Sequence, residues 1–543
     1  MSGPTSDRVA APFIQTSPSR PHARYAGGRA GTVLLAMAVM VTLAALAISP
    51  VPAGVLAAAR DEVAILSSEP SSYDPAVQGD IGSAAVTAQI FEGLTAIDPG
   101  LSVRPALAAS WDVSDSGRRI VFHLRPGLTF SDGSPLTAAD VVRSWLRLID
   151  PGSPSPLASL VTDVEGAEDY LRGRSRDPAS VGLRAAGNDV EVRLSHPEAE
   201  FTSVVAGPSF GIVPAGAAPD GRVGSGGYVL AGTAKSEITL RANDRYWAGR
   251  PAIATVRLIT SLGGRSPVDA FDKGDLDYTG IGAFDASWIA YDPDMGPHLR
   301  AVPSLSVQYL GFDVRQRPFD DVRVRRAFAL AVDWPRLVRL ASTGDDLPAT
   351  SMVPPGVPGR SERDVGQHAD PEQARQLLAD AGYPQGRGFP GVTYLSGGTG
   401  IDEGIIRQLH DNLGIAVRYE TMDFGPYFTR LAQDPPAIWS LGWTADYLGP
   451  NDFLGVLLGS RASNNYGHWN SAAFDEAITD AGAATDPAVA RAAYDRAEEI
   501  VHAEVPVVPI SYGSGWALSR DGLNGATQNG LGYLRMAGLT WSP

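Results

Sequence analysis

The chain has 543 residues, more than one ordinary domain holds, and this length suggests roughly two to four compact units with clefts between them. Hydrophobic residues make up 44% and charged residues 19%, a composition typical of a globular protein and not of a coiled coil or a disordered chain. The formal net charge of −16 argues against nucleic-acid binding, which needs clustered cations, and the absence of cysteine excludes disulfides, thiolate metal sites and a cysteine-linked lipid anchor.

The first 59 residues have the pattern of an export signal. Residues 32–48 are almost wholly apolar, and they follow a basic stretch that contains Arg8, Arg20, Arg24 and Arg29. Pro50, Pro52 and Gly54 and the small residues 57–59 come next, as at a signal-peptidase site. We predict that residues 1–59 are a basic segment plus either a cleaved signal peptide or an uncleaved membrane anchor. The apolar run is long for the first and short for the second, so both remain open.

From residue 60 onward, short strand patterns alternate with helix patterns, which predicts a mixed α/β fold. Apolar Ile120, Phe122 and Leu124 recur at every second position, as in a strand, and turn residues follow at 126–127 and 132–133. Thr137 and Asp140 then form a capping box at the start of an amphipathic helix.

Three further helices have clear start signals. Asp321 caps residues 322–332, and this helix must break or restart near Pro335. Asp370 followed by a proline begins a helix that ends near Gly382, and Asp486 begins a long helix over residues 486–501.

An apolar run over residues 505–513 predicts a return strand, and a similar run covers residues 305–314. Two such segments crossing between lobes would form a hinge.

Several segments, taken in order, resemble the oligopeptide- and dipeptide-binding proteins of ABC importers, a peptide-type branch (family 5) of the extracellular solute-binding proteins. No single segment is diagnostic, but their order over most of residues 61–515 is specific. The matching stretches are YDPA (73–76), FEGL (91–94), PALAASW (105–111), FHLRPGLTFSDGSPLTAADVV (122–142), GSGGYVL (224–230), KGDLD (273–277), YLGFDVRQRPFDDVRVRRAFALAVD (309–333), ARQLLADAGYPQG (374–386) and GWTADYLGPNDFL (442–454).

The resemblance implies a two-lobed clamp of the class II periplasmic type, with an extra subdomain in the first lobe and no catalytic activity. We place lobe I at residues 60–95, 220–303 and 506–543, its extra subdomain at 96–219, and lobe II at 304–505. A ligand would be enclosed between the lobes and passed to a membrane permease.

Asp446 is the main candidate ligand-binding residue. It follows an apolar run, AIWSLGW (437–443), that looks like a buried strand, and ligands bind at the carboxyl ends of strands in α/β folds. A carboxylate there would supply a charge-assisted hydrogen bond to a buried α-ammonium group. The resemblance also implies this role, because the acid of the W-x-A-D-Y motif in the oligopeptide-binding branch binds the free amine of the peptide. The alternative is that Asp446 only caps the turn before Gly449 and Pro450.

We expect four neighbours of Asp446 to contribute to the same site. The backbones of Gly442 and Thr444 would bind the peptide main chain as an added strand, and the rings of Trp443 and Tyr447 would form apolar walls. The segment departs from the usual family pattern at Gly449, where an acidic residue commonly precedes the proline. A second departure is Gly227, which replaces a proline often found in the GSGGY turn.

Other motifs favour enzymes or metal sites only weakly. GPSFG (207–211) matches the nucleophile motif of hydrolases, but Pro208 disfavours the strained turn that Ser209 would need. The eight histidines are scattered without metal-ligand spacing, and SGGTG (396–400) lacks the lysine of a phosphate-binding loop. Asp275 and Asp277 fit a short turn at a strand end better than a cation site. We expect neither a cofactor nor a bound metal.

The sequence therefore predicts an exported, monomeric solute-binding protein that captures short peptides for an ABC-type permease. Alternatives within the resembled family are binding proteins for oligosaccharides, opines or metal chelates such as those of nickel. Outside it, the alternatives are a secreted hydrolase and a peptide sensor or chaperone.

Overall fold

The computed structural model describes residues 60–542 except 217–218, 303, 342–345 and 423. The predicted export segment, including residues 32–48, lies outside the described residues. No helix in the described part of the chain is both long and apolar enough to cross a membrane.

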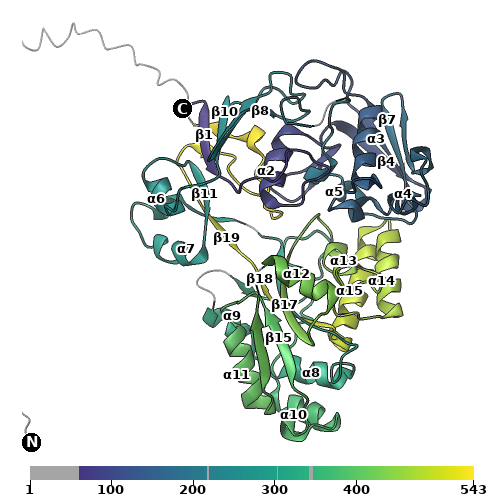
Figure 1. The fold of residues 1–543 in the computed structure, drawn as a ribbon, viewed down its shortest axis with the longest axis vertical. Helices are drawn as coiled ribbons and strands as arrows, with labels where there is room; N and C mark the ends of the chain where they lie inside the picture. The colour runs from purple at the N-terminus through teal and green to yellow at the C-terminus, as the bar shows by residue number, and fades with distance from the viewer. Residues whose placement is uncertain (1–59, 217–218, 303, 342–345, 423, 543) are drawn as a thin grey trace, which may run out of the picture. The chain divides into compact units, whose positions relative to one another are not determined.

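Two mixed sheets form the framework (Figure 1). The first sheet has seven strands in the order β12 (Leu299–Val302), β19 (Gly515–Ser519), β11 (Tyr278–Ile281), β1 (Glu62–Leu66), β10 (Thr255–Ile259), β9 (Glu237–Ala242) and β8 (Tyr228–Ala234). The second sheet has six, in the order β14 (Leu347–Pro348), β18 (Val507–Tyr512), β13 (Ser306–Phe312), β17 (Ile438–Thr444), β15 (Val392–Ser396) and β16 (Val417–Thr421). Sheets with both parallel and antiparallel pairs confirm the predicted α/β class.

A third, antiparallel sheet belongs to the extra subdomain of the first lobe. Its strands lie in the order β4 (Ala108–Ser114), β5 (Arg119–Leu124), β7 (Asp189–Arg193) and β6 (Leu183–Ala186). Helix α3 (Ala138–Leu146) packs on this sheet, where buried Trp145 meets Phe122 edge to face. The smaller elements nearby are α4 (Ala167–Leu171) and α5 (Phe201–Val204). Two two-stranded sheets pair β2 (Thr95–Ile97) with β3 (Val103–Pro105) and β20 (Leu523–Asn524) with β21 (Thr540–Trp541).

Helices cover both faces of the second sheet. Because side chains alternate along a strand, neighbouring residues of β13 face different cores: Tyr309 contacts one and Leu310 the other. The core around Leu310 contains α8 (Val322–Leu330), α9 (Trp334–Ala341), α10 (Pro371–Asp380) and α11 (Asp402–Leu413). The core around Tyr309 contains α12 (Phe424–Gln433), α13 (Gly455–Leu458), α14 (Ala472–Ala483) and α15 (Pro487–Glu504). The first sheet packs against α2 (Ile81–Ile90). The remaining helices of the described chain are α6 (Pro267–Asp272) and α7 (Ala283–Ile289).

The helix starts predicted from capping residues are confirmed. Asp370 accepts a hydrogen bond from the Gln373 amide at 2.9 Å, and Asp140 accepts one from the Thr137 amide at 2.8 Å. Asp321 and Asp486 cap α8 and α15 in the same way. The expected break near Pro335 lies between the end of α8 and the start of α9. Local capping chemistry therefore determines where these helices begin.

The chain crosses between the two large sheets twice. It leaves the first sheet after β12 and enters the second at β13, and it returns between β18 and β19, at Gly513 and Ser514. Residues 507–512 thus pair in the second sheet, and their assignment to lobe I was wrong. The strand pattern was recognised, but which sheet it joins depends on pairing with β13, which lies 200 residues earlier. The other lobe boundaries stay predictions.

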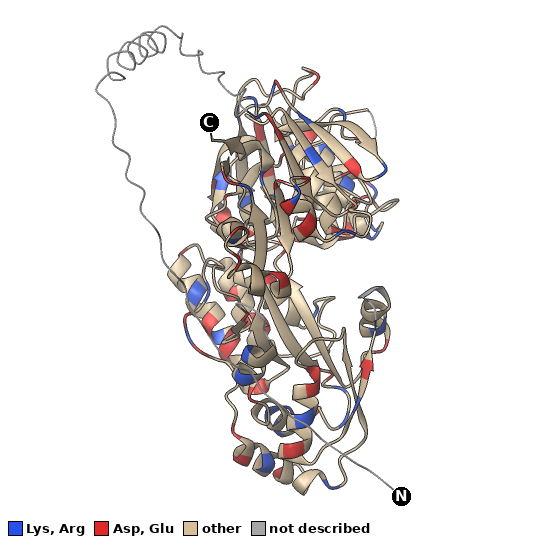
Figure 2. Cartoon of the chain, turned by 90° about the vertical axis from the view of Figure 1, so that its left-hand side faces the viewer, with Lys and Arg blue, Asp and Glu red and all other residues tan. Residues whose placement is uncertain are grey.

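Charged residues are distributed over all parts of the fold. Among the described residues, Figure 2 shows acidic and basic positions interspersed along the elements. Many of them form exposed ion pairs, such as Arg172 with Glu168 and Arg496 with Asp480. Such pairs contribute little to stability, and their mixture of signs gives no basic face for a polyanion.

Candidate functional site

Strand β17 positions the candidate site. It lies inside the second sheet, antiparallel to β13 and parallel to β15, and its Trp439 is buried edge to face against Tyr309. The strand ends at Thr444, and the amide of Ala445 donates to the Leu305 carbonyl at 2.8 Å. Asp446 follows immediately, so the prediction that it lies just beyond a buried strand is confirmed.

Asp446 is half-buried, and no described residue forms a hydrogen bond or ion pair with its carboxylate. Its backbone amide donates to Asp452 Oδ2 at 3.0 Å, which fixes the residue without using its side chain. Burial raises the pKa of the Asp446 carboxyl to about 6. The arrangement leaves a desolvated acceptor for which the described residues supply no cation.

Asp452 lies beside Asp446 and is completely buried. Its Oδ2 accepts from the Asp446 amide and from the Trp443 indole, the latter at 3.2 Å, whereas Oδ1 has no partner among the described residues. Burial, and then the charge of Asp446, raise the pKa of Asp452 well above its usual range. Of the two acids, therefore, Asp452 retains its proton and Asp446 ionises first.

Gly442 and Thr444 are exposed on β17. Both pair with β13 on one side of the strand, whereas on the other side β15 pairs only with Ile438 and Trp439. The β15 ladder therefore stops before Gly442 and Thr444, and their binding of a peptide main chain stays a prediction. A Cβ added to Gly442 would lie 2.9 Å from the Gln308 amide oxygen, so a larger residue there would crowd this surface.

The two predicted aromatic walls differ. Trp443 is half-buried, and its indole is bound to Asp452. Tyr447 is 4% exposed and belongs to the core of the extra subdomain, with its hydroxyl bound by the Asn451 amide at 3.1 Å. The expectation that Tyr447 offers an open wall to a ligand is therefore not supported, because the residue is buried in the same core cluster as Phe201.

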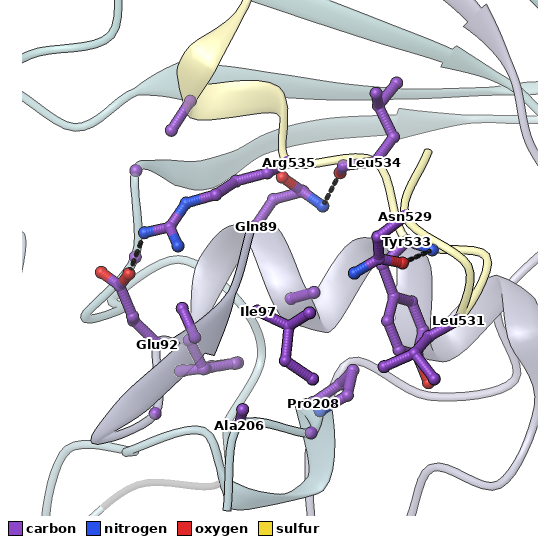
Figure 3. A pocket seen from close by; sticks show the side chains of 18 of the residues that line it. Gln89, Glu92, Ile97, Ala206, Pro208, Asn529, Leu531, Tyr533, Leu534 and Arg535 are labelled. Carbon is purple, nitrogen blue, oxygen red and sulfur yellow. Dashed lines mark hydrogen bonds and ion pairs between the residues drawn. The ribbon is translucent and has the colours of Figure 1, made fainter. Parts of the chain in front are cut away.

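A cavity of about 830 Å³, counting solvent at its mouth, lies between the end of α2 and the C-terminal segment (Figure 3). It is lined by the end of α2 and by residues 93–99, 206–208, 226–227 and 527–537, with Tyr246. Burial and the charges of Asp446 and Asp452 raise the pKa of Tyr533, so this lining residue connects the cavity with the two acids. Sequence reasoning missed Asp452, Tyr533 and the C-terminal lining, since no local motif marks them.

The sequence signature described as "Bacterial extracellular solute-binding proteins, family 5 Middle" matches residues 102–465. The chain belongs to this family of solute-binding proteins. As a member of an extracellular family it is an exported protein.

Two curated relatives illustrate the range of ligands in the family. This family 5 protein is 31% identical to the probable deoxycholate-binding periplasmic protein YgiS of Escherichia coli K12, over 82% of this chain and 86% of that protein. It is 29% identical to the periplasmic oligopeptide-binding protein OppA of Salmonella typhimurium LT2, over 87% and 91% of the respective chains.

Solved structures of similar fold agree with the two-lobed clamp. The unliganded open form of the murein tripeptide-binding protein MppA matches with a TM-score of 0.75 and 24% identity, over 89% of this chain and 97% of that one. Haemophilus influenzae OppA in complex with RPPGFSPFR matches with a TM-score of 0.73 and 24% identity, over 89% and 99%. The predicted class II clamp is confirmed at the level of the fold.

The structure gives no support to the competing sites. Ser209 lies in a 3₁₀ turn (Pro208–Phe210), is 4% exposed and accepts a hydrogen bond from Gln78 Nε2 at 2.6 Å. Asp277 is bound by Arg60, and Asp275 by Arg265. The described residues contain no group of three or more His, Asp and Glu side chains suited to a metal ion.

Proposed function

We propose that this family 5 protein is a binding protein without catalytic activity that captures short peptides and delivers them to an ABC-type permease. Peptide binding is in the names of its relatives OppA and MppA, and it is extended here to this chain. The proposal includes a monomeric protein at the outer face of the cytoplasmic membrane, free or tethered by residues 32–48. We further propose that no lipid anchors it, because the chain has no cysteine.

The observation that carries the proposal is the unpaired carboxylate of Asp446. A half-buried anion without a cationic partner among the described residues is costly, and the α-ammonium of a peptide would relieve that cost with charge-assisted hydrogen bonds. The open backbone at Gly442 and Thr444 supports the same ligand, because a peptide main chain can pair with it in extended form. In this proposal Trp443 contacts the ligand beside Asp446.

The decisive experiment compares peptides with free and blocked amino termini. We expect an equimolar mixture of tripeptides of varied sequence to raise the thermal unfolding temperature of the full-length chain, and the same mixture with acetylated amino termini to have no effect. Acetylation removes the cation that Asp446 would bind but keeps the peptide backbone. Equal stabilisation by both mixtures would contradict the role of Asp446, and stabilisation by deoxycholate alone would contradict peptide capture.

Peptide affinity should depend on pH. The pKa of Asp446 in the chain without ligand is about 6, so its carboxyl group is mostly protonated at pH 5 and mostly ionised at pH 7. The α-amine of a peptide stays protonated below about pH 8. We therefore expect affinity for a bound tripeptide to rise about tenfold between pH 5 and pH 7. Calorimetric titrations in two buffers should show proton release at pH 5.5. Affinity that is flat across this range would contradict the prediction.

A further inference from the structure

The turn that carries Asp446 is held by a part of the chain that the sequence placed in the other lobe. The amide of Leu448 donates to Ser203 Oγ of α5 at 2.7 Å. Tyr447 is buried in the core of the extra subdomain, as described above. The turn over residues 446–452, which we name the ligand turn, therefore contacts the extra subdomain through both backbone and side chain.

Glu200, directly before α5, lies against Gly449 of the ligand turn. Its Oε1 accepts from the Tyr494 hydroxyl of α15 at 2.8 Å. A Cβ added to Gly449 would lie 1.8 Å from Glu200 Oε2, so the carboxyl group occupies the space a side chain would fill. Gly449 has φ of 177°, an extended conformation open to any residue, so a glycine is needed here for space and not for backbone freedom.

The surroundings of this carboxyl group disfavour a negative charge. Oε2 is covered and has no partner among the described residues, although the stem of Glu200 is half-exposed. The titratable groups around it are Glu198 on its own segment, Asp452 on the ligand turn, and the phenols Tyr447 and Tyr494. None of these is a cation.

Burial first, and then the charge of Glu198, raise the pKa of Glu200 well above its usual range. Glu198 itself has a pKa raised to about 7, mainly by burial. The pKa of His196 is raised to about 9 by Asp163, and this cation acts on Glu198. Hydrogen bonds from Tyr494 and from the Asn451 backbone amide act against the raised pKa of Glu200, but burial outweighs them. The contact with Gly449 therefore forms with a carboxyl group that favours the uncharged state.

We propose that Glu200 is a positioning residue for the ligand turn: its uncharged carboxyl group holds residues 446–452 in place, and its ionisation loosens them. The extra subdomain would then control the order of the segment that carries Asp446. Only the last step, from the ordered turn to peptide capture, rests on the proposed function.

The raised pKa of Glu200 determines how stability changes with pH. The folded chain binds the Glu200 proton more tightly than the unfolded chain does. The contribution of protonated Glu200 to the free energy of unfolding is therefore complete below the ordinary pKa of a glutamate. It falls as the pH rises toward the raised pKa of Glu200 in the folded chain. Asp446, Glu198 and Glu498 have raised pKa values as well and add a decline in the same direction. Removing the Glu200 charge should reduce the pH dependence without abolishing it.

The test measures hydrogen exchange of residues 446–452 in the full-length chain without peptide, at pH 5.5 and 8.5, corrected for the intrinsic pH dependence of exchange. We expect protection in the wild type to fall about tenfold or more at pH 8.5. Glu200→Gln, which has the same shape and no charge, should lose much less protection than the wild type between the two pH values. Glu168→Gln, which alters an exposed acid of the same subdomain, should follow the wild type.

Equal protection of the wild-type turn at both pH values would overturn the proposal, as would a Glu200→Gln variant that loses protection as the wild type does. Because the wild-type profile alone can refute it, the result does not depend on how well the variant folds. In a separate arm, the tripeptide mixture should stabilise Glu200→Gln at pH 8.5 more than it stabilises the wild type. If the mixture stabilises neither protein, peptide capture is contradicted, and the exchange data still decide the role of Glu200.

Discussion

Replacing Asp446 by asparagine is expected to weaken the binding of a free-amino tripeptide by about 30-fold or more. The substitution keeps the shape of the side chain and the backbone bond to Asp452 but removes the charge that faces the ligand amine. Loss of one partner of a desolvated charge pair costs about 2–5 kcal/mol of binding free energy. Titration calorimetry at pH 7 on the wild type and Asp446→Asn, with one tripeptide selected from the mixture, measures the change.

Asp452→Asn is the matched control, because it alters a neighbouring acid that already holds its proton. An asparagine oxygen can accept the same bonds from the Trp443 indole and the Asp446 amide, and no charge is lost. We expect its tripeptide affinity to stay within about threefold of the wild type, less than 1 kcal/mol. Equal losses in both variants would show that the effect arises from damage to the turn and not from a missing charge on Asp446.

The sequence was sufficient for features encoded within a few residues. Helix α10 begins where an aspartate precedes a proline, and Asp446 follows β17 because the apolar run and the turn residues are adjacent in the chain. Such signals arise from local hydrogen bonding and side-chain alternation, which act over short distances along the chain. The helix starts and the location of the main candidate acid were therefore predictable from local signals, whereas the two-lobed clamp was predicted from the resemblance to a family.

The details around the site were not predictable, because they depend on contacts between distant segments. Tyr447 is buried by the extra subdomain, whose Phe201 lies more than 200 residues earlier. Glu200 meets Gly449 only in the folded chain, and Tyr533 reaches the acid pair from the C-terminal segment. A glycine in an unusual motif position was a visible signal, but its meaning required the carboxyl group that occupies its space.

Glu92→Gln is expected to cause the largest loss of stability. Glu92 follows α2, is 8% exposed and binds three donors: Arg535, the Tyr246 hydroxyl at 3.0 Å and the Trp247 indole at 2.7 Å. It thus joins α2 to the C-terminal segment that lines the cavity (Figure 3). Arg535 is 43% exposed, so water can solvate its charge, whereas the Tyr246 and Trp247 donors lose their shared carboxylate acceptor, and we expect a loss of about 1–3 kcal/mol. Urea unfolding at pH 7 measures this loss.

Glu499→Gln provides the comparison, since Glu499 pairs with Arg363 where both side chains are about half exposed. Water solvates Arg363 when its partner is lost, so we expect a change in the free energy of unfolding below about 1 kcal/mol. The contrast between the two variants tests the buried part of the network, because Glu92 also binds Tyr246 and Trp247, whereas Glu499 pairs with Arg363 at the surface. If Glu92→Gln were as mild as Glu499→Gln, the contacts of Glu92 with Tyr246 and Trp247 would contribute little, and its link from α2 to the C-terminal segment would not stabilise the fold.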